Sequence, residues 1–353
     1  MTAGQPPLPV APASLAARVV RWQRSHGRHG LPWQGTRDPY RVWLSEVMLQ
    51  QTQVATVLDY YPRFLARFPT VQALAAAPMD DVLALWSGLG YYSRARHLHH
   101  CAQQVVALHG GVFPDSSAEL GRLPGIGRST AAAIAAFCFG ERAAILDGNV
   151  KRVLTRWLGF EGDLARAAEQ ARLWAAAEAL LPARQVDVYT QGLMDLGATV
   201  CLARKPSCLL CPLADDCAAH RAGTPERYPV KTRTLKRSRR ENALLWLEHR
   251  GLWWLVQRPP RGVWAGLWTL PEYASKDSLL QATAGWDGQG TWLPLVQHAL
   301  THFDWTLHPL AWRWPQRART LPDLPQGRWA APEEALALGL PAPVRRLLET
   351  RLR

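Results

Sequence analysis

Four cysteines fall within 17 residues of this 353-residue chain, at positions Cys201, Cys208, Cys211 and Cys217. Their spacing, C-x6-C-x2-C-x5-C, allows four thiolates to converge on one metal centre, and tetrahedral zinc is the first general interpretation. Zinc sites usually use two separated C-x2-C pairs, however, and only one tight pair occurs here. Wider, uneven spacing equally suits an iron–sulfur cluster. The residues alone therefore leave zinc and a cluster as alternatives.

Charge and composition indicate a nucleic-acid partner or an anionic surface. The net charge is +13 and the pI is about 10, which favours binding to a polyanion. Residues 1–12 lack the features of a secretory signal, and the apolar run 131–139 is too short to span a bilayer. We therefore expect a soluble, intracellular protein. In that setting Cys101 and Cys138, each alone in a helical pattern, are expected to be buried and apolar.

The length predicts two domains. Residues 1–220 are rich in alanine and show apolar residues every three or four positions, which predicts helices. Residues 221–240 carry eight Lys or Arg and one Glu, which predicts a solvated basic linker. Residues 241–353 begin with two short apolar runs around His249-Arg250-Gly251, which predict a hairpin. The segment 335–352 predicts one or two closing helical segments of a small α/β domain.

Three residues are expected to cap helices in the first domain, namely Ser14, Asp38 and Asp147. A second local signal is L-P-G-I-G-R-S-T at 123–130, where Gly125 and Gly127 permit a tight turn before a helix that begins near Ser129. Bare N–H groups at a helix N-terminus favour an anion. A plain glycine-rich turn is the alternative, and the basic character of the chain favours phosphate binding.

Two carboxylates have the properties that cleavage of a glycosidic bond requires. Glu46 lies among the apolar pairs Trp43-Leu44 and Val47-Met48, and apolar surroundings help a carboxyl group to hold its proton. A solvated glutamate on the polar face of its helix is the alternative. Asp147 is a helix cap that can also face a cleft. A proton donor and a carboxylate beside a developing sugar cation are the usual division of labour in glycosidases.

The segments S-E-V-M-L-Q-Q-T-Q at 45–53 and I-L-D-G-N-V-K-R-V at 145–153 closely resemble MutY-type adenine DNA glycosylases. The cysteine spacing resembles the iron–sulfur loop of the wider endonuclease III superfamily, and 123–130 resembles its helix-hairpin-helix motif. The resemblance implies a mainly α catalytic domain (1–220) that holds a 4Fe-4S cluster on its four cysteines, with a structural and DNA-positioning role.

The resemblance also implies roles for individual residues. Glu46 would be the proton donor, and Asp147, helped by Asn149, the transition-state carboxylate. The remaining residues would contact DNA. Those around the flipped base would be Arg28, Trp33 and Gln191, those at the intercalation surface Gln50, Gln51 and Tyr91, and those at the hairpin Gly125, Gly127 and Ser129.

The segment R-P-P-R-G-V-W-A-G-L-W at 258–268 resembles the opening of a MutT-like (Nudix) domain. The acidic metal-binding helix of a nucleotide hydrolase does not follow it, which opposes pyrophosphatase activity. In the family this domain (241–353) inspects the base opposite adenine through a Phe-Ser-His or Phe-Thr-His loop. The matching run here is Leu300-Thr301-His302, so Thr301 and His302 are retained and the aromatic residue is lost. An ordinary half-exposed strand is the alternative for this run.

Ser129 decides the expected subclass. Bifunctional relatives carry a nucleophilic lysine there, and this chain has no lysine before Lys151. We therefore expect a monofunctional, monomeric adenine glycosylase acting on duplex DNA with adenine opposite 8-oxoguanine or guanine. The rivals are a bifunctional oxidised-pyrimidine glycosylase, which lysine at 129 would favour, and a non-enzymatic DNA-binding redox sensor, which loss of Glu46 or Asp147 would favour.

Overall fold

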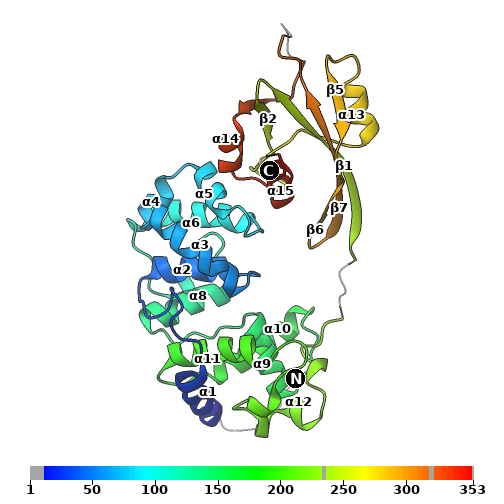
Figure 1. Ribbon diagram of the computed structural model, residues 1–353. Coiled ribbons are helices and arrows are strands. Elements are labelled where there is room, and N and C mark those ends of the chain that lie inside the picture. The colour runs from blue at the N-terminus through cyan, green and yellow to red at the C-terminus, as the bar shows by residue number, and fades with distance from the viewer. Residues whose placement is uncertain (1–11, 233–235, 318–321, 352–353) are drawn as a thin grey trace. The chain divides into compact units, whose positions relative to one another are not determined.

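The computed structural model describes residues 12–232, 236–317 and 322–351 (Figure 1). Residues 233–235 of the expected basic linker lie outside these ranges, as do residues 1–11. The chain divides into two compact units. The first contains Met1–Pro62, Thr70–Gln72 and Cys101–Thr234, and the second contains Arg63–Pro69, Ala73–His100 and Leu235–Arg353. The domain boundaries expected from the sequence stay a prediction.

The first unit is helical, as the apolar periodicity predicts. Its core forms where α1 packs against α11 and α11 packs against α9, around fully buried residues such as Leu15, Leu154 and Leu196. Cys101 and Cys138 are both buried, as expected. The helices that lie in it wholly or in part are α1 (Pro12–His26), α2 (Pro39–Leu49), α3 (Val54–Arg67), α4 (Val71–Ala76), α6 (Ser93–His109), α7 (Ser117–Leu120), α8 (Arg128–Ile134) with a π-helical turn at Ala135–Phe139, α9 (Gly148–Leu158), α10 (Ala167–Ala179), α11 (Val186–Thr199) and α12 (Ala218–Arg221).

Two of the three expected helix caps are confirmed. The Asp38 side chain accepts a hydrogen bond from the Tyr40 N–H at 2.9 Å, and Asp147 accepts one from the Val150 N–H at 2.7 Å. The prediction for Ser14 is wrong, because α1 already begins at Pro12. Proline suits the first turn of a helix, where its missing N–H has no intrahelical partner to lose.

The second unit contains a mixed sheet in the order β3-β2-β1-β7-β5, with β4 paired to β1, β6 to β7 and β8 to β2. The pairing of β1 with β7 is parallel, and the other pairings in the described residues are antiparallel. The strands are β1 (Ser238–His249), β2 (Leu252–Gln257), β3 (Trp268–Thr269), β4 (Glu272–Tyr273), β5 (Gln289–Trp292), β6 (Val296–Ala299), β7 (Phe303–Arg313) and β8 (Gly327–Ala330). The C-terminal helices are α13 (Lys276–Ala282), α14 (Pro332–Ala337) and α15 (Ala342–Glu349).

The predicted hairpin is confirmed. Strands β1 and β2 pair through Glu248 with Trp253 and through His249 with Leu252. The two connecting residues, Arg250 and Gly251, have φ of 51° and 77°. Positive φ at both positions is typical of a type I′ turn, whose twist matches that of the strands. The two closing helical segments are α14 and α15, also as predicted.

The sheet begins earlier than the sequence suggests. Strand β1 starts at Ser238, so residues 238–240 of the basic segment are held in the sheet and are not a solvated tether. The cause is the parallel pairing with β7, which supplies backbone partners to these charged residues even though their side chains stay exposed.

Helix α5 (Met79–Trp86) and the start of α6 pack within the second unit. The hydroxyl groups of Ser87 and Tyr92 each donate to the Leu340 carbonyl at 3.0 Å, and the Trp268 indole N–H donates to the Asp80 carboxylate at 3.1 Å. These bonds explain why residues 73–100 group with the C-terminal sheet. No helix in the described part of the chain has both the length and the apolar character needed to cross a membrane.

Candidate active site

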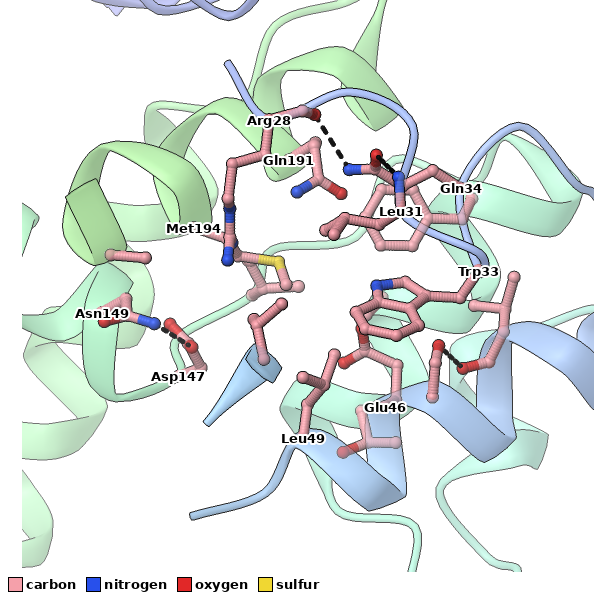
Figure 2. Close-up of a pocket in the computed structure, with 18 of the residues that line it drawn as sticks. Arg28, Leu31, Trp33, Gln34, Glu46, Leu49, Asp147, Asn149, Gln191 and Met194 are labelled. Carbon is pink, nitrogen blue, oxygen red and sulfur yellow. Dashed lines mark hydrogen bonds between the residues drawn. The ribbon is translucent and has the colours of Figure 1, made fainter. Parts of the chain in front are cut away.

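A cavity of about 1500 Å³ opens in the first unit, and nine of the residues singled out from the sequence line it. Its walls come from the loop between α1 and α2, the end of α2, the start of α8, the start of α9 and the middle of α11 (Figure 2). The nine are Arg28, Trp33, Glu46, Gln50, Gln51, Ser129, Asp147, Asn149 and Gln191. Segments more than 140 residues apart in the chain therefore meet at one hollow.

Glu46 lies on the last turn of α2, with Ser45 and Val47 buried on either side and its own side chain at the cavity wall. Burial raises the pKa of this carboxyl to about 8, and the charge of Asp147 adds to the effect. The group therefore holds a proton at neutral pH. This environment contradicts the alternative of a solvated glutamate on a polar helix face.

Asp147 faces the same cavity from the start of α9, and its surroundings differ from those of Glu46. Burial raises its pKa, but the Val150 and Asn149 N–H groups, the Arg152 charge and the Asn149 side chain all act in the opposite direction. The Asn149 amide donates to Asp147 at 3.4 Å (Figure 2). Burial raises the pKa of both carboxyl groups, and the hydrogen bonds and the Arg152 charge that oppose this rise act on Asp147.

Arg152 holds Asn149 in place and was not identified from the sequence. Its guanidinium donates to the Asn149 side-chain oxygen at 2.8 Å, to the Gly197 carbonyl at 2.5 Å and to the Cys201 carbonyl at 2.7 Å. A chain of hydrogen bonds thus runs from Asp147 through Asn149 and Arg152 to Cys201, the first of the four clustered cysteines. Only its position within D-G-N-V-K-R, one turn after Asn149, could have drawn attention to it.

Arg28 and Gln191 share a partner that the sequence also did not reveal. The Asp195 carboxylate is fully buried and accepts from the Arg28 guanidinium at 2.7 Å, from the Arg28 N–H at 2.9 Å and from the Gln191 amide at 2.9 Å. A buried carboxylate bonded in this way fixes both side chains at the cavity wall. Asp195 lies four residues after Gln191 on α11, a spacing that places both on one helix face.

Trp33 is nearly buried and packs edge-on against Tyr61, with ring centroids 5.5 Å apart. Figure 2 shows its indole beside Glu46 and Leu49. Gln50 donates to the Thr130 hydroxyl at 3.3 Å, whereas Gln51 is exposed with φ of 57°. The left-handed backbone at Gln51 is uncommon for a residue with a side chain and occurs where the surrounding structure enforces it.

The glycine-rich hairpin lies beside the cavity, and its last two residues, Ser129 and Thr130, are among the lining residues. Gly125 has φ of 76°, a conformation that favours glycine, and Gly127 caps α8 with open space around it. The Ser129 hydroxyl accepts from the Leu146 N–H at 3.0 Å, just before Asp147. Arg128 is engaged elsewhere, since it pairs with Glu178 and stacks on Trp174.

The four clustered cysteines line one small cavity, together with Arg156 and His220. The Arg156 guanidinium donates to the Cys201 sulfur at 3.3 Å. Among the described residues, no group of His, Cys, Asp or Glu is arranged to hold a single metal ion. The four thiols around a shared cavity nevertheless form a donor set that fits an iron–sulfur cluster.

Tyr91, Thr301 and His302 belong to the second unit. Thr301 and His302 form the tight turn between β6 and β7 and are exposed, so they are not part of a half-exposed strand. Tyr91 has φ of 48° and is 45% exposed, and its hydroxyl lies 3.4 Å from the Thr301 hydroxyl. The structure thus brings together two residues that are 210 positions apart in the chain.

Three family models match the chain. Residues 44–177 match the HhH-GPD superfamily of base excision DNA repair proteins, residues 201–217 match the iron–sulfur binding domain of endonuclease III, and residues 242–350 match the NUDIX domain. The fold classes predicted from the sequence are therefore confirmed. Of the two alternatives for the cysteines, the iron–sulfur cluster is supported and zinc is not.

Similar proteins over most of the chain are adenine DNA glycosylases. The protein from Buchnera aphidicola is 34% identical over 94% of this chain and 95% of its own length. The human protein is 34% identical over 90% of this chain and 70% of its own length. A thermostable thymine-DNA glycosylase of known structure covers 60% of this chain with 27% identity and a TM-score of 0.54. An endonuclease III–DNA complex, at 21% identity and a TM-score of 0.51, supports the fold.

Proposed function

Because the chain belongs to the adenine DNA glycosylase family, we propose that it hydrolyses the N-glycosidic bond of adenine mispaired with 8-oxoguanine or guanine and so initiates base excision repair. The observation that carries the proposal is the pair Glu46 and Asp147, which face one cavity in unequal environments. The substrate is duplex DNA, and the protein acts as a monomer.

Glu46 supplies the proton. Adenine is a poor leaving group, so a ring nitrogen must be protonated as the glycosidic bond breaks. A carboxyl group whose pKa is about 8 is protonated at neutral pH and can donate to the base. Trp33 lies beside Glu46 (Figure 2), and an apolar ring at this place favours the protonated form of the acid.

Asp147 stabilises the sugar. Departure of the base leaves oxocarbenium character on the deoxyribose, and a carboxylate aimed at this charge lowers the barrier. The hydrogen bonds from Val150 and Asn149 keep Asp147 oriented and favour its ionised form. Water then adds to the sugar and leaves an abasic site, with free adenine as the second product.

Arg28 and Gln191 hold the flipped adenine. Their shared bond to the buried Asp195 leaves the remaining donors of both side chains available to the base. Extrusion of a base from the duplex costs a few kcal/mol and is cheapest at a mismatch, which contributes to selectivity.

The cluster is a 4Fe-4S cluster held by Cys201, Cys208, Cys211 and Cys217. When bound, it supplies cross-links that keep this loop folded and present its basic residues to DNA. Arg152 ties the same loop to Asn149, so the loop also supports the orientation of Asp147.

The enzyme is monofunctional. A lyase step needs an amine that attacks the sugar, and the residue at the hairpin is Ser129, whose hydroxyl is bonded to the Leu146 N–H. No lysine precedes Lys151 in the chain. The product therefore keeps its sugar–phosphate backbone intact.

The other residues singled out from the sequence bind the duplex. The hairpin at Gly125 and Gly127 holds a phosphate, Gln50, Gln51 and Tyr91 wedge the strands apart, and Thr301 with His302 contacts the base opposite adenine. Each presents polar or aromatic groups to solvent or to the cavity, as such contacts require.

Single-turnover cleavage of duplexes with adenine opposite 8-oxoguanine, guanine and thymine tests the proposal. We expect fast release of adenine opposite 8-oxoguanine or guanine, slow release opposite thymine, and no borohydride-trapped adduct of comparable yield. Equal rates on all three duplexes would refute the proposed selectivity, and efficient trapping of the native protein would refute the monofunctional assignment.

A further inference from the structure

Three arginines lie near the Thr301–His302 turn. Arg237 directly precedes β1, and Arg239 and Arg240 are in its first three residues. Strands β1 and β7 run side by side (Figure 1), and their parallel pairing aligns Ser238 with Phe303, Arg239 with Asp304 and Arg240 with Trp305. The Ser238 N–H also donates to the His302 carbonyl at 3.1 Å, so the first residue of β1 is bonded directly to the turn. The basic run is therefore held at a defined distance from the turn by backbone hydrogen bonds.

The three arginines differ in the contacts that their side chains already make within the protein. Arg237 pairs with Asp304, which offsets its charge. Arg240 lies over the Phe303 ring, with its guanidinium carbon 4.0 Å from the centroid. Stacking of this kind fixes the plane of the guanidinium and leaves its N–H donors at the edge free. The Arg239 side chain is exposed and makes no hydrogen bond or ion pair with the described part of the chain.

We propose that Arg239 and Arg240 bind the backbone phosphates that flank the base opposite adenine. The inference rests on the proposed function, because that function assigns the base opposite adenine to the Thr301–His302 turn. Neighbouring strands lie about 4.8 Å apart, and one residue of a strand advances about 3.3 Å. An arginine side chain two or three residues from the turn thus reaches the phosphates next to any base that the turn contacts.

Arg239 and Arg240 are consecutive in β1, so their side chains point to opposite faces of the sheet and suit two separate phosphates. Each exposed guanidinium group supplies charge and fork-shaped donors, the chemistry that suits phosphate. Such contacts carry no sequence information, but they set the register of the protein on the strand. Asp304 lies at the same place and opposes the approach of a phosphate, so Arg237 mainly neutralises it. The basic segment thus positions the DNA strand opposite adenine relative to the Thr301–His302 turn, in addition to attracting DNA through its charge.

The first test measures how the affinity of the full-length protein for an adenine·8-oxoguanine duplex depends on salt. Arg239→Gln with Arg240→Gln should lower the salt slope by about 1.8, which is roughly 0.9 for each phosphate. Between 50 and 200 mM salt, the native protein should then lose about twelvefold more affinity than the double variant. The control is Arg250→Gln, an exposed arginine at the other end of β1, roughly 35 Å away. An unchanged slope in the double variant would overturn the proposal.

The second test locates the phosphates. Neutral methylphosphonate linkages flanking the 8-oxoguanine should weaken binding of the native protein and have no further effect on the double variant. The same linkages flanking the adenine should weaken both proteins equally. Equal weakening by the 8-oxoguanine linkages, or coupling on the adenine strand, would overturn the assignment.

A third variant should change the affinity for DNA in the opposite direction. Asp304→Asn removes the anion and frees Arg237, so binding should tighten and the salt slope should steepen; weaker or unchanged binding would count against the proposal. All three tests measure binding and not base release. If the native protein fails to excise adenine, the proposed function fails while these measurements still report on the arginines.

Discussion

Glu46 and Asp147 carry the same functional group, and their neighbours give them different electrostatic environments. Glu46 lies between buried side chains and next to a like charge, which together favour its neutral form. Asp147 is also buried, but hydrogen bonds and Arg152 favour its ionised form. The chemistry at this site is therefore a property of the environment of each carboxyl group.

Conservative substitution of the two carboxylates should abolish most of the activity without unfolding the protein. Glu46→Gln keeps the shape but cannot supply a proton, and loss of a general acid typically costs about 10²–10⁴ in rate. Asp147→Asn retains the helix cap, since asparagine caps about as well as aspartate, and should cost at least a comparable amount. Single-turnover excision with cluster-loaded protein is the measurement, with Glu161→Gln at the surface as a control. A variant that stays within about threefold of native, well below that range, would remove the role assigned to its residue.

The pH profile should report Glu46 directly. Because its pKa is about 8, the excision rate should fall as pH rises through about 8, and it should fall again at low pH, where Asp147 loses its charge. Native protein binds this proton more tightly than unfolded protein, whose glutamate titrates near 4.5. The free energy of unfolding contributed by this group should therefore decrease from about pH 4.5 to 8. In Glu46→Gln this decrease should vanish; a native-like decrease in the variant would show that another group titrates there.

At the scale of elements, two helices that are far apart in the chain, α1 and α9, contact the iron–sulfur loop at residues 201–217. From α9, Arg156 donates to the Leu202 carbonyl at 2.6 Å and to the Ala203 carbonyl at 3.0 Å. From α1, Arg18 pairs with Asp216, which directly precedes the last cysteine. The loop has little regular structure of its own, so these contacts restrict its motion.

Removal of the contact from α1 should loosen the cluster. Arg18→Ala leaves Asp216 unpaired beside Cys217, and we expect faster loss of iron to a chelator together with faster bleaching of the visible absorbance. Arg21→Ala is the matched control, since Arg21 is an exposed arginine one turn later on the same helix. Iron content and bleaching rate provide the measurement, and equal rates for the two variants would show that α1 does not restrain the loop.

At the scale of the molecule, residues 73–100 and the C-terminal sheet belong to one compact unit. Gly339 lies so close to Leu83 that an added Cβ would be 2.9 Å from the Leu83 Cβ and 3.0 Å from its backbone carbon. Both residues are in the second unit, which therefore depends on chain segments more than 250 positions apart.

Gly339→Ala should destabilise the second unit, because overpacking a closed contact typically costs about 1–3 kcal/mol. Thermal or denaturant unfolding of the full-length protein measures the effect. Leu83→Gly should itself be destabilising, yet in that background the added methyl group should cost less, since the Leu83 Cβ that it meets at 2.9 Å is gone. If the losses in the free energy of unfolding caused by the two substitutions simply add, the strain does not come from this contact.

The sequence by itself determined the local features: the helices of 12–232, the β1–β2 hairpin, the caps at Asp38 and Asp147, and motifs that indicate the chemistry. Each depends on residues within about one turn of each other, so local pattern is sufficient. Only the tertiary structure decided that Glu46 has a raised pKa, that Asp195 holds Arg28 and Gln191, and that Arg239 and Arg240 pair with Asp304 and Trp305, just after the Thr301–His302 turn. A pKa, a buried ion pair and a strand register depend on residues distant in the chain, whose positions packing alone defines.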